Sequence, residues 1–345
     1  MPIEQITGEE ASSDPARTLF ESDAWRQVIK QTYDFTFYRA YERDGSGRAG
    51  EETVSLPFAT TDSDLRARAV SLPFSDYVRT DGIDLSTYRS LAEVIRSAYP
   101  KSPLIFKTTY PHDVEAIGSI LEKGYYHTVP TGSHEEVDQN MRSSFQRGVR
   151  KAKRKGVTIQ RATTPEAMSV FYDLHRSLRF GKFGKIPQPR QFFSEIRRAF
   201  LEDEQGFVLQ ALRQETVIGA LVALQHRGVL YYKFGASEED ALEYRPNNLL
   251  FHNLLHHAVD EGLRAVDLGF SGVGESYRGL RRFKESFGGE RRPIVTFRMD
   301  PPGHDEAKEN ELDDLLGQLT ETVVEQRLDA EATDAVSEIL YPYFA

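Results

Sequence analysis

The stretch YRGLRRFKESFGG, residues 277–289, places a lysine where its charge could do chemistry. At about 100° per residue, a helix here puts Leu280, Phe283 and Phe287 on one narrow stripe, and Lys284 falls inside that stripe. The position is unusual because only 12 of the 43 basic residues of the chain are lysines. An ammonium among aromatic rings either extends along the surface to water or faces a negative charge.

That negative charge could belong to a reaction. When an amine attacks an ester or thioester carbonyl, an oxyanion develops, and an ammonium in a dry site stabilises it far more than one in water. Lys284 is therefore a candidate catalytic residue, with Phe283 shaping the site. Asp267, at the end of the expected strand AVDLGF, could bind or deprotonate the attacking amine, although strand-terminal aspartates often only complete hydrogen-bond networks.

A basic segment, residues 141–161, carries eight Lys or Arg and no acid in a chain whose net charge is -10. We expect it to form one helix, with Asp138 as a possible N-cap and Gly156 as a C-terminal stop. Its apolar face leaves a cationic surface that suits phosphates, although a solvated helix face is the alternative. The candidate phosphate-binding residues of this surface are Arg147, Arg150, Lys151 and Lys153.

Further binding candidates come from two strands and a helix start. Asp76 and Tyr77, in SLPFSDY, are candidates for an acceptor cleft, as are some of Tyr231, Tyr232 and Lys233, because strand residues alternate between two faces. We select Tyr232 from that strand. In the long helix that starts EYRPNNLL, Asn248 could cap and Arg245 could meet a phosphate at the positive end.

One histidine row raises the question of a metal. His252, His256 and Asp260 have i, i+4, i+8 spacing in this helix. The row lies on a polar edge beside an apolar face that includes Leu254 and Leu255, and the sequence shows no further ligand cluster. We therefore predict no metal site.

Composition limits the remaining possibilities. A chain of 345 residues with 39% hydrophobic content can build two cores. The absence of cysteine excludes disulfides, thiolate zinc sites and a cysteine nucleophile. No apolar run is long enough for a transmembrane segment, and the N-terminus does not read as a signal peptide, so we expect a cytoplasmic protein.

The elements that must position these residues occur twice in the same order. Each half reads as a β-rich meander followed by alternating helices and strands, which predicts a duplicated α/β (α+β) fold with mostly antiparallel sheets flanked by helices. In the first half we expect strands within 67–77 and 125–130 and a short helix over 112–123. We divide the chain into a flexible N-terminus (1–18), two domains (19–138 and 139–301) and an acidic helical tail (302–345).

The ordered set of motifs resembles a known family. SLPFSDY, RGVRKAKRKGVTI, FYDLHRSLRFGKFGKIPQPRQFF, YYKFGAS with RPNNLLFHNLLHHAVDEG, and VDLGFSG with LRRFKESFGG are together similar to the FemAB-like transferases, which are built from two tandem GNAT (acyl-CoA N-acyltransferase) domains. The resemblance spans roughly residues 20–300. It implies transfer of an acyl group to an amine, and it matches Phe283 and Lys284 to a Phe-Lys pair at the reaction centre of Fem-type enzymes.

The resemblance leaves the substrates open. Fem-type members take an aminoacyl group from charged tRNA and add it to a peptidoglycan precursor, whereas other relatives are acetyltransferases. The usual GNAT pyrophosphate loop is missing before the long helix, which puts acetyl-CoA or another acyl-CoA in doubt as the donor. We expect a polyanionic donor, CoA-linked or tRNA-linked, and a small amine or nucleotide-linked acceptor. The alternative is a non-catalytic RNA-binding or carrier protein with the same fold.

Overall fold

The computed structural model describes residues 1–7, 18–43, 52–61, 65–80, 83–109, 117–302, 304–326 and 328–344. The chain divides into two compact units, which are described separately. Unit 1 contains residues 1–125, 292–316 and 340–345, and unit 2 contains residues 126–291 and 317–339. This division differs from the predicted ranges, because the first unit ends before 138 and takes in residues 292–316, of which 295–299 pair with another strand of that unit.

Unit 1 is built on strands that pair mostly in antiparallel fashion. They follow the order β1 (Ile3–Gln5), β2 (Thr36–Arg43), β3 (Glu52–Thr61), β4 (Arg68–Val70), β5 (Leu104–Thr108) and β12 (Glu290–Met299). Only β4 and β5 pair in parallel among these described strands. Helix α2 (Leu85–Ala98) covers one face, where Phe58, Phe106 and Phe297 are fully buried. Helix α1 (Asp23–Tyr33) completes the main elements of this unit.

Unit 2 repeats this plan. Its strands follow the order β11 (Ala265–Gly272), β10 (Val229–Ser237), β9 (Thr216–His226), β8 (Gly206–Arg213) and β7 (Thr158–Ala162), and β6 (Ser119–Pro130) enters it from unit 1 beside β11. The parallel pair is β10–β11, and the other described pairings are antiparallel. Both units therefore confirm the predicted mixed, mostly antiparallel fold.

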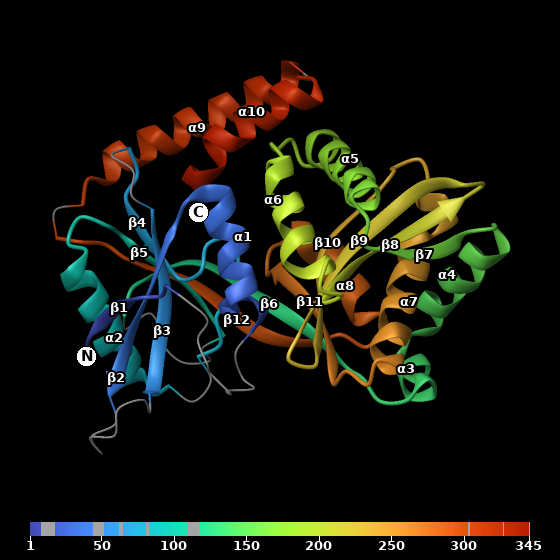
Figure 1. Ribbon diagram of the computed structural model, residues 1–345, viewed down its shortest axis with the longest axis horizontal. Coiled ribbons are helices and arrows are strands. Elements are labelled where there is room, and N and C mark those ends of the chain that lie inside the picture. Colours follow the sequence, from blue (N-terminus) through green and yellow to red (C-terminus); the bar gives the residue numbers. More distant parts are fainter. Residues whose placement is uncertain are drawn as a thin grey trace. The chain divides into compact units, whose positions relative to one another are not determined.

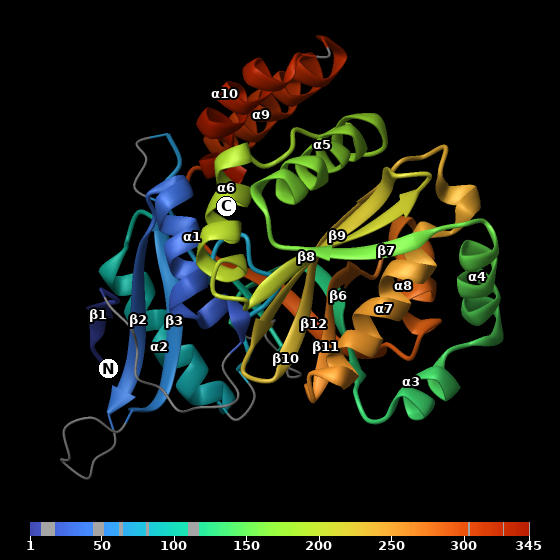
Figure 2. The ribbon, with the colours of Figure 1, turned by 45° about the vertical axis from the view of Figure 1, so that its right-hand side comes forward.

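Helices cover both faces of the unit 2 sheet, as Figures 1 and 2 show. Helices α5 (Pro165–Gly181) and α6 (Arg190–Ile196) lie on one face, and α7 (Pro246–Asp260) lies on the other with α4 (Ser143–Arg154) packed against it. Strand β9 is buried along most of its length, which explains its nearly continuous apolar sequence. The main core lies between the sheet and α4, α7 and the residues after α8 (Arg278–Glu285).

Three sequence predictions about elements are wrong in detail. The basic helix does not begin at Asp138, because Asp138 lies inside a separate helix, α3 (His134–Asn140), and the N-cap of α4 is Arg142. The strand expected over 67–77 ends at Val70. Residues 119–123 belong to β6 instead of a helix, while 112–116 lie outside the described residues. Gly156 does end α4, with a φ of +76°.

The predicted helical tail is real, and ion pairs attach it to the rest of the protein. It contains α9 (Glu306–Gln326) and α10 (Ala330–Leu340). In unit 1, Glu309 pairs with Arg298 and, at 2.6 Å, with Arg68. Burial favours a raised pKa for Glu309, but these hydrogen bonds outweigh it and lower the pKa to about 2. In unit 2, Asp334 accepts hydrogen bonds from the Tyr172 hydroxyl at 2.5 Å and the Arg190 backbone N–H at 2.9 Å.

Candidate functional site

Lys284 is the only buried residue of α8, with a relative exposure of 2%. Its Nζ donates hydrogen bonds to the backbone carbonyls of Gly269, at 3.0 Å, and Phe270, at 2.8 Å. The ammonium therefore does not reach water along the surface, which was the alternative that the sequence left open. The aromatic stripe is only partly as predicted, because Phe287 is buried while Leu280 is 40% exposed.

The two carbonyls that accept hydrogen bonds from Lys284 belong to a distorted part of β11. Gly269 has a φ of +70°, a conformation that side-chain-bearing residues rarely adopt. Asp267 is 2% exposed, and its Oδ1 accepts a hydrogen bond of 2.7 Å from the backbone N–H of Gly269. The carboxylate thus supports the turn that points two carbonyls at Lys284. A contact of Asp267 with an amine substrate stays a prediction.

The distortion lies where β10 and β11 stop pairing. Their parallel register runs from Val229 and Ala265 only as far as Tyr231 and Asp267, although both strands continue. Strand β10 also has a register shift against β9 between Tyr232 and Phe234. Parallel strands that separate in this way expose backbone groups at the edge of an opening, and β-bulges commonly occur next to active sites. Lys284 is held at this point of β11.

A buried histidine that the sequence reasoning missed lies near the lysine. His127 of β6 is 0% exposed, and its Nε2 lies 2.7 Å from the hydroxyl of Ser271 on β11. Within the described part of the chain its Nδ1 has no hydrogen-bond partner. Burial, together with the positive charges of Lys284, Arg291 and Arg281, lowers the pKa of His127 to about 3. The imidazole is therefore neutral at physiological pH.

The missed signal was the alternation of β6. In GYYHTVP, the histidine shares one face of the strand with the residues two positions before and after it, a tyrosine and a valine, so it can face the core. The sequence does not show which strand lies beside it. Arg281 adds a second positioning contact, because its guanidinium donates to the backbone carbonyls of Gly272 and, at 2.9 Å, Gly274. This contact fixes the connection between β11 and α8.

Phe283 belongs to an aromatic cluster that joins four elements. It is half-buried, with ring centroids 5.3 Å from Phe251 and Phe287 and 6.0 Å from Phe145. Tyr232 of β10 joins the same cluster through Phe251, at 4.7 Å between ring centroids. Of the predicted strand candidates, Tyr232 therefore lies on the same side of the sheet as Phe283.

The basic residues of α4 point away from the core. Phe145, Val149 and Ala152 are buried, whereas Arg147, Arg150 and Lys153 are exposed and Lys151 is half-buried. The predicted cationic surface therefore exists.

Helix α4 approaches α7 closely at Gly148. A Cβ at that position would lie 2.5 Å from the Nδ2 of Asn248, so the side chain of Asn248 packs on α4. Asn248 is not the predicted cap. The N-cap of α7 is Arg245, which is exposed and has a φ of +61°. An arginine therefore lies at the positively polarised N-terminus of α7, as predicted.

Asp76 and Tyr77 lie in unit 1, in a loop between β4 and α2. Tyr77 is 3% exposed, and its ring packs edge-on against Phe20 with 5.8 Å between centroids. Two residues of the same loop, Leu72 and Phe74, have φ values of +47° and +58°. Such left-handed conformations of bulky residues are costly and cluster at functional sites, so the loop remains a candidate for binding.

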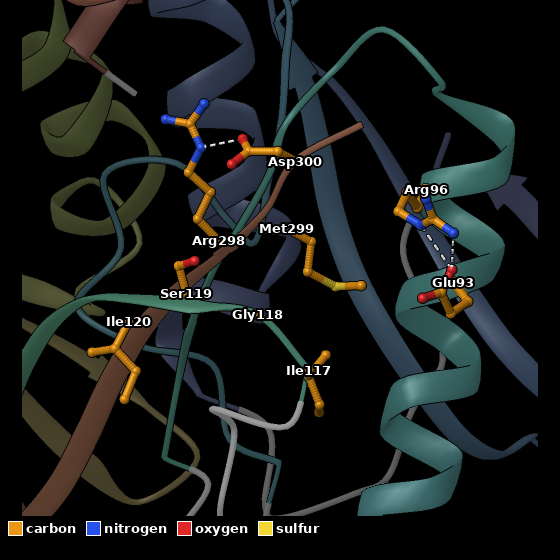
Figure 3. Close-up of a pocket in the computed structure, with 9 residues that line it drawn as sticks. All are labelled: Glu93, Arg96, Ile117, Gly118, Ser119, Ile120, Arg298, Met299 and Asp300. Carbon is orange, nitrogen blue, oxygen red and sulfur yellow. Dashed lines mark hydrogen bonds and ion pairs between the residues drawn. The ribbon is translucent and has the colours of Figure 1, made fainter. Parts of the chain in front are cut away.

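A hollow of about 600 Å³ also lies in unit 1. Figure 3 shows the ion pair of Glu93 and Arg96 on one side of it and Arg298 with Asp300 on the other. The four charged side chains that line this hollow form these two ion pairs, and its lining includes none of the predicted site residues. We therefore assign the candidate site to the Lys284 region of unit 2.

Comparisons with known proteins identify the domain type and the fold. Residues 139–285 match the family model of the acetyltransferase (GNAT) domain. No curated protein sequence matches the chain. Among solved structures, FemX is similar over 81% of this chain and 92% of its own, with a TM-score of 0.60 and 14% identity. L-PGS from Bacillus licheniformis is similar over 86% and 94%, with a TM-score of 0.51 and 12% identity.

The matched segment includes the basic helix, the long helix α7 and Lys284. At 14% and 12% identity the two solved structures show a shared fold and say nothing about substrate. The resemblance to FemAB-like GNAT proteins that the motifs indicated is thus confirmed in domain type and fold. Among the described residues, none of the helices combines the length and apolar character needed to cross a bilayer.

Proposed function

From a chain whose residues 139–285 form a GNAT domain and whose fold is that of FemX, we propose an N-acyltransferase that uses Lys284 to stabilise an oxyanion. The acyl or aminoacyl group would come from an activated ester or thioester. The observation that carries the proposal is a buried ammonium fixed by two backbone carbonyls where β10 and β11 separate.

The chemistry follows from that charge. The nitrogen lone pair of the acceptor amine forms a bond to the donor carbonyl carbon, and the carbonyl electron pair moves to oxygen. Collapse of this intermediate breaks the bond to sulfur or oxygen, the thiol or hydroxyl leaves, and the amine nitrogen loses a proton. An ammonium that is already oriented in a dry site stabilises the oxyanion without reorganisation, which is worth about 3–4 kcal/mol for one donor of this kind.

His127 and Asp267 would act as positioning residues. His127 is neutral and anchored to Ser271, so it adds no second positive charge beside Lys284. Asp267 fixes the Gly269 turn whose carbonyl receives the ammonium. Both contacts orient groups around the ammonium.

The donor would bind through its phosphates. The exposed cations of α4, including Arg150 and Lys153, suit either CoA or tRNA, and Arg245 adds a charge at the positive end of α7. Asp76 and Tyr77 remain proposals for the acceptor side. The exposed cationic helix also favours the second candidate, an RNA-binding or carrier protein with this fold and no acyl transfer.

The test is the melting temperature of the protein with CoA, acetyl-CoA, longer acyl-CoA thioesters, charged tRNA and uncharged tRNA. A ligand at about 100 times its Kd adds roughly 2.7 kcal/mol of stability, which is readily visible. We expect one activated donor to raise the melting temperature, and we expect Arg150→Glu with Lys153→Glu to weaken that shift at low salt. Lys185→Glu, at an exposed lysine outside α4, is the matched control.

The possible results separate the candidates. A shift with one thioester supports CoA-dependent N-acylation, and a shift with charged tRNA alone supports aminoacyl transfer. An equal shift with charged and uncharged RNA, without any transfer product, supports the RNA-binding protein. If no ligand changes the melting temperature, both the donor assignment and the role of α4 are wrong.

A further inference from the structure

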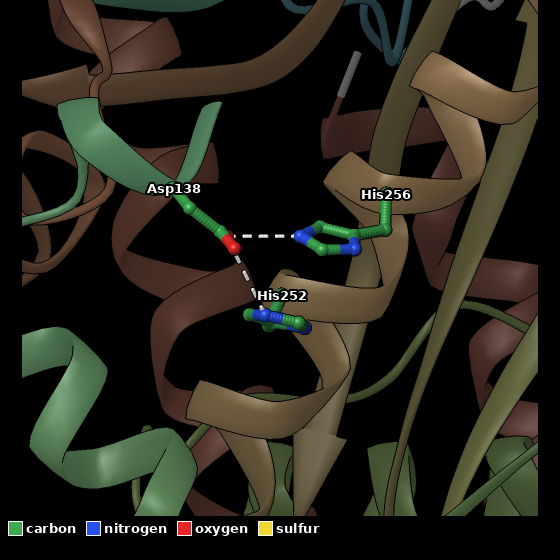
Figure 4. Close-up of side chains that lie close together, drawn as sticks. All are labelled: Asp138, His252 and His256. Carbon is green, nitrogen blue, oxygen red and sulfur yellow. Dashed lines mark hydrogen bonds and ion pairs between the residues drawn. The ribbon is translucent and has the colours of Figure 1, made fainter. Parts of the chain in front are cut away.

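Three side chains from two helices converge on the outer face of α7. His252 and His256 are one helical turn apart on α7, and Asp138 reaches them from α3, as Figure 4 shows. One ligand atom from each residue lies within 4.8 Å of the other two. The sequence argument against a metal used the polar edge of the helix and the absence of a further ligand cluster, whereas the structure brings Asp138 to the two histidines from another helix. Asp260, the third residue of the predicted row, instead pairs with His134 at 2.7 Å.

The distances fit a metal centre. Oδ1 of Asp138 lies 2.9 Å from Nε2 of His256 and 3.6 Å from Nε2 of His252. With metal–ligand bonds of about 2.0–2.1 Å in tetrahedral geometry, two ligand atoms must be about 3.3 Å apart, a value between the two observed distances. The imidazole rings are stacked with 4.0 Å between centroids, and both present Nε2 to Asp138. Small side-chain rotations would admit an ion.

Imidazole nitrogens are the commonest protein ligands of transition metals. The nearby side chains outside the cluster include Lys153 of α4 and His134 of α3. Asp138 is about half exposed, with 47% of its side chain accessible, so an ion can enter from solvent.

We propose that Asp138, His252 and His256 bind a divalent transition metal ion, with Zn²⁺, Co²⁺ and Ni²⁺ as the ions that suit two imidazoles and one carboxylate. Hard cations such as Mg²⁺ prefer oxygen ligands and are excluded by this set. Water completes the coordination. The ion would join α3 to α7 and so fix the start of the cationic helix α4, which follows α3 directly.

The experiment is metal binding by the full chain, purified without a histidine tag and treated with chelator. Isothermal titration calorimetry with ZnCl₂ and CoCl₂ gives the stoichiometry and the Kd. The melting temperature shows whether the ion stabilises the fold. The variants are Asp138→Asn, His252→Gln and His256→Gln, which keep the side-chain size. His257→Gln, on the same helix but packed against Phe207, is the matched control.

We expect one Zn²⁺ per chain, a melting temperature that rises with Zn²⁺ and returns with chelator, and a loss of roughly tenfold or more in affinity in each of the three variants. His257→Gln should bind as the unaltered protein does. The proposal is overturned if Zn²⁺ and Co²⁺ fail to bind, or if binding is equally strong in the three variants. A loss in His257→Gln as large as in the others would also overturn it, because the binding would then not depend on this cluster.

Discussion

At the scale of single residues, the environment of Lys284 distinguishes it from a surface lysine. The sequence predicts that Lys284 lies on an aromatic stripe, and Phe283 and Lys284 resemble the Phe-Lys pair of Fem-type enzymes. The sequence could not show that two backbone carbonyls of β11 accept hydrogen bonds from the ammonium. Those contacts depend on the turn at Gly269 and Asp267, which local sequence patterns around Lys284 do not report. His127 could not be identified either, because its partner Ser271 is 144 residues away.

One prediction follows for His127. His127→Leu removes the hydrogen bond to Ser271, and we expect kcat to fall about tenfold with KM unchanged, since the ammonium would be less well positioned. His127→Gln can restore a hydrogen bond to Ser271 and should recover most of the rate.

The pH profile checks whether His127 only positions. Because its pKa is about 3, the imidazole is neutral throughout the range near pH 6–8, so the rate profile of His127→Gln should keep the shape of the unaltered enzyme. If the rate of this variant no longer changed with pH near 6–7 where the rate of the unaltered enzyme does, His127 would exchange a proton in the reaction.

At the scale of elements, the end of α8 determines where Lys284 lies. Gly289 donates its backbone N–H to the Lys284 carbonyl at 3.1 Å, and a Cβ at Gly289 would lie only 2.6 Å from that oxygen. The oxygen is backbone, so the helix end itself would have to move. Gly279 lies inside α8 and has open space around the position of a Cβ.

We therefore expect opposite effects from two glycine substitutions. Gly289→Ala should lower the free energy of unfolding by about 1–3 kcal/mol and reduce activity, because the overpacked helix end shifts Lys284. Gly279→Ala should leave activity unchanged and raise stability by up to about 1 kcal/mol through helix propensity. Denaturant unfolding and turnover of both variants test this, and equal effects would contradict it.

Elements with strong periodicity were predictable, and their boundaries were not. The helix over Lys284, the long helix α7 and the three strands β8 to β10 follow from apolar spacing and short turns. The break between α3 and α4 at Met141 and Arg142 was not predictable, because both helices share a helical pattern and Arg142 makes no side-chain cap hydrogen bond. The strand that replaces a predicted helix at 119–123 reflects pairing in a sheet, which local propensity does not report.

At the scale of the whole molecule, the repeated order of elements predicted the duplicated fold. It could not predict that residues 292–299 return to unit 1, because the pairing of β12 with β5 is a long-range contact. The tail gave no readable function in the sequence. In the structure, Glu309 pairs with Arg68 in unit 1, and Asp334 accepts a hydrogen bond from Arg190 in unit 2. Both partners are more than 100 residues away along the chain, so the sequence did not indicate these contacts.

The stability of the protein should depend on pH through buried histidine. His175 is 7% exposed among the rings of Phe171, Phe193 and Phe234, and burial lowers its pKa to about 4. The unfolded chain, with an ordinary pKa near 6.5, takes up a proton that the folded state refuses. The free energy of unfolding therefore falls as pH drops from about 6.5 to 4, by up to about 1.4 kcal/mol per pH unit for this residue.

The variant His175→Phe keeps an aromatic ring in the cluster but cannot take up a proton. Denaturant unfolding at pH 8, 7, 6 and 5 should show a shallower loss of stability in the variant below pH 6.5, with parallel behaviour of the two proteins above it. Identical slopes at low pH would show that His175 does not contribute.

The central claim is that the Lys284 ammonium stabilises the oxyanion of an acyl transfer. The most direct measurement is the rate of acyl transfer by Lys284→Met, with the donor that raises the melting temperature and an amine acceptor. Arg282→Met, an exposed position of the same helix, is the control. We predict a loss of about 10²–10³ in kcat for Lys284→Met, with the fold and donor affinity retained and Arg282→Met fully active. Unchanged turnover in a folded Lys284→Met protein would contradict the account.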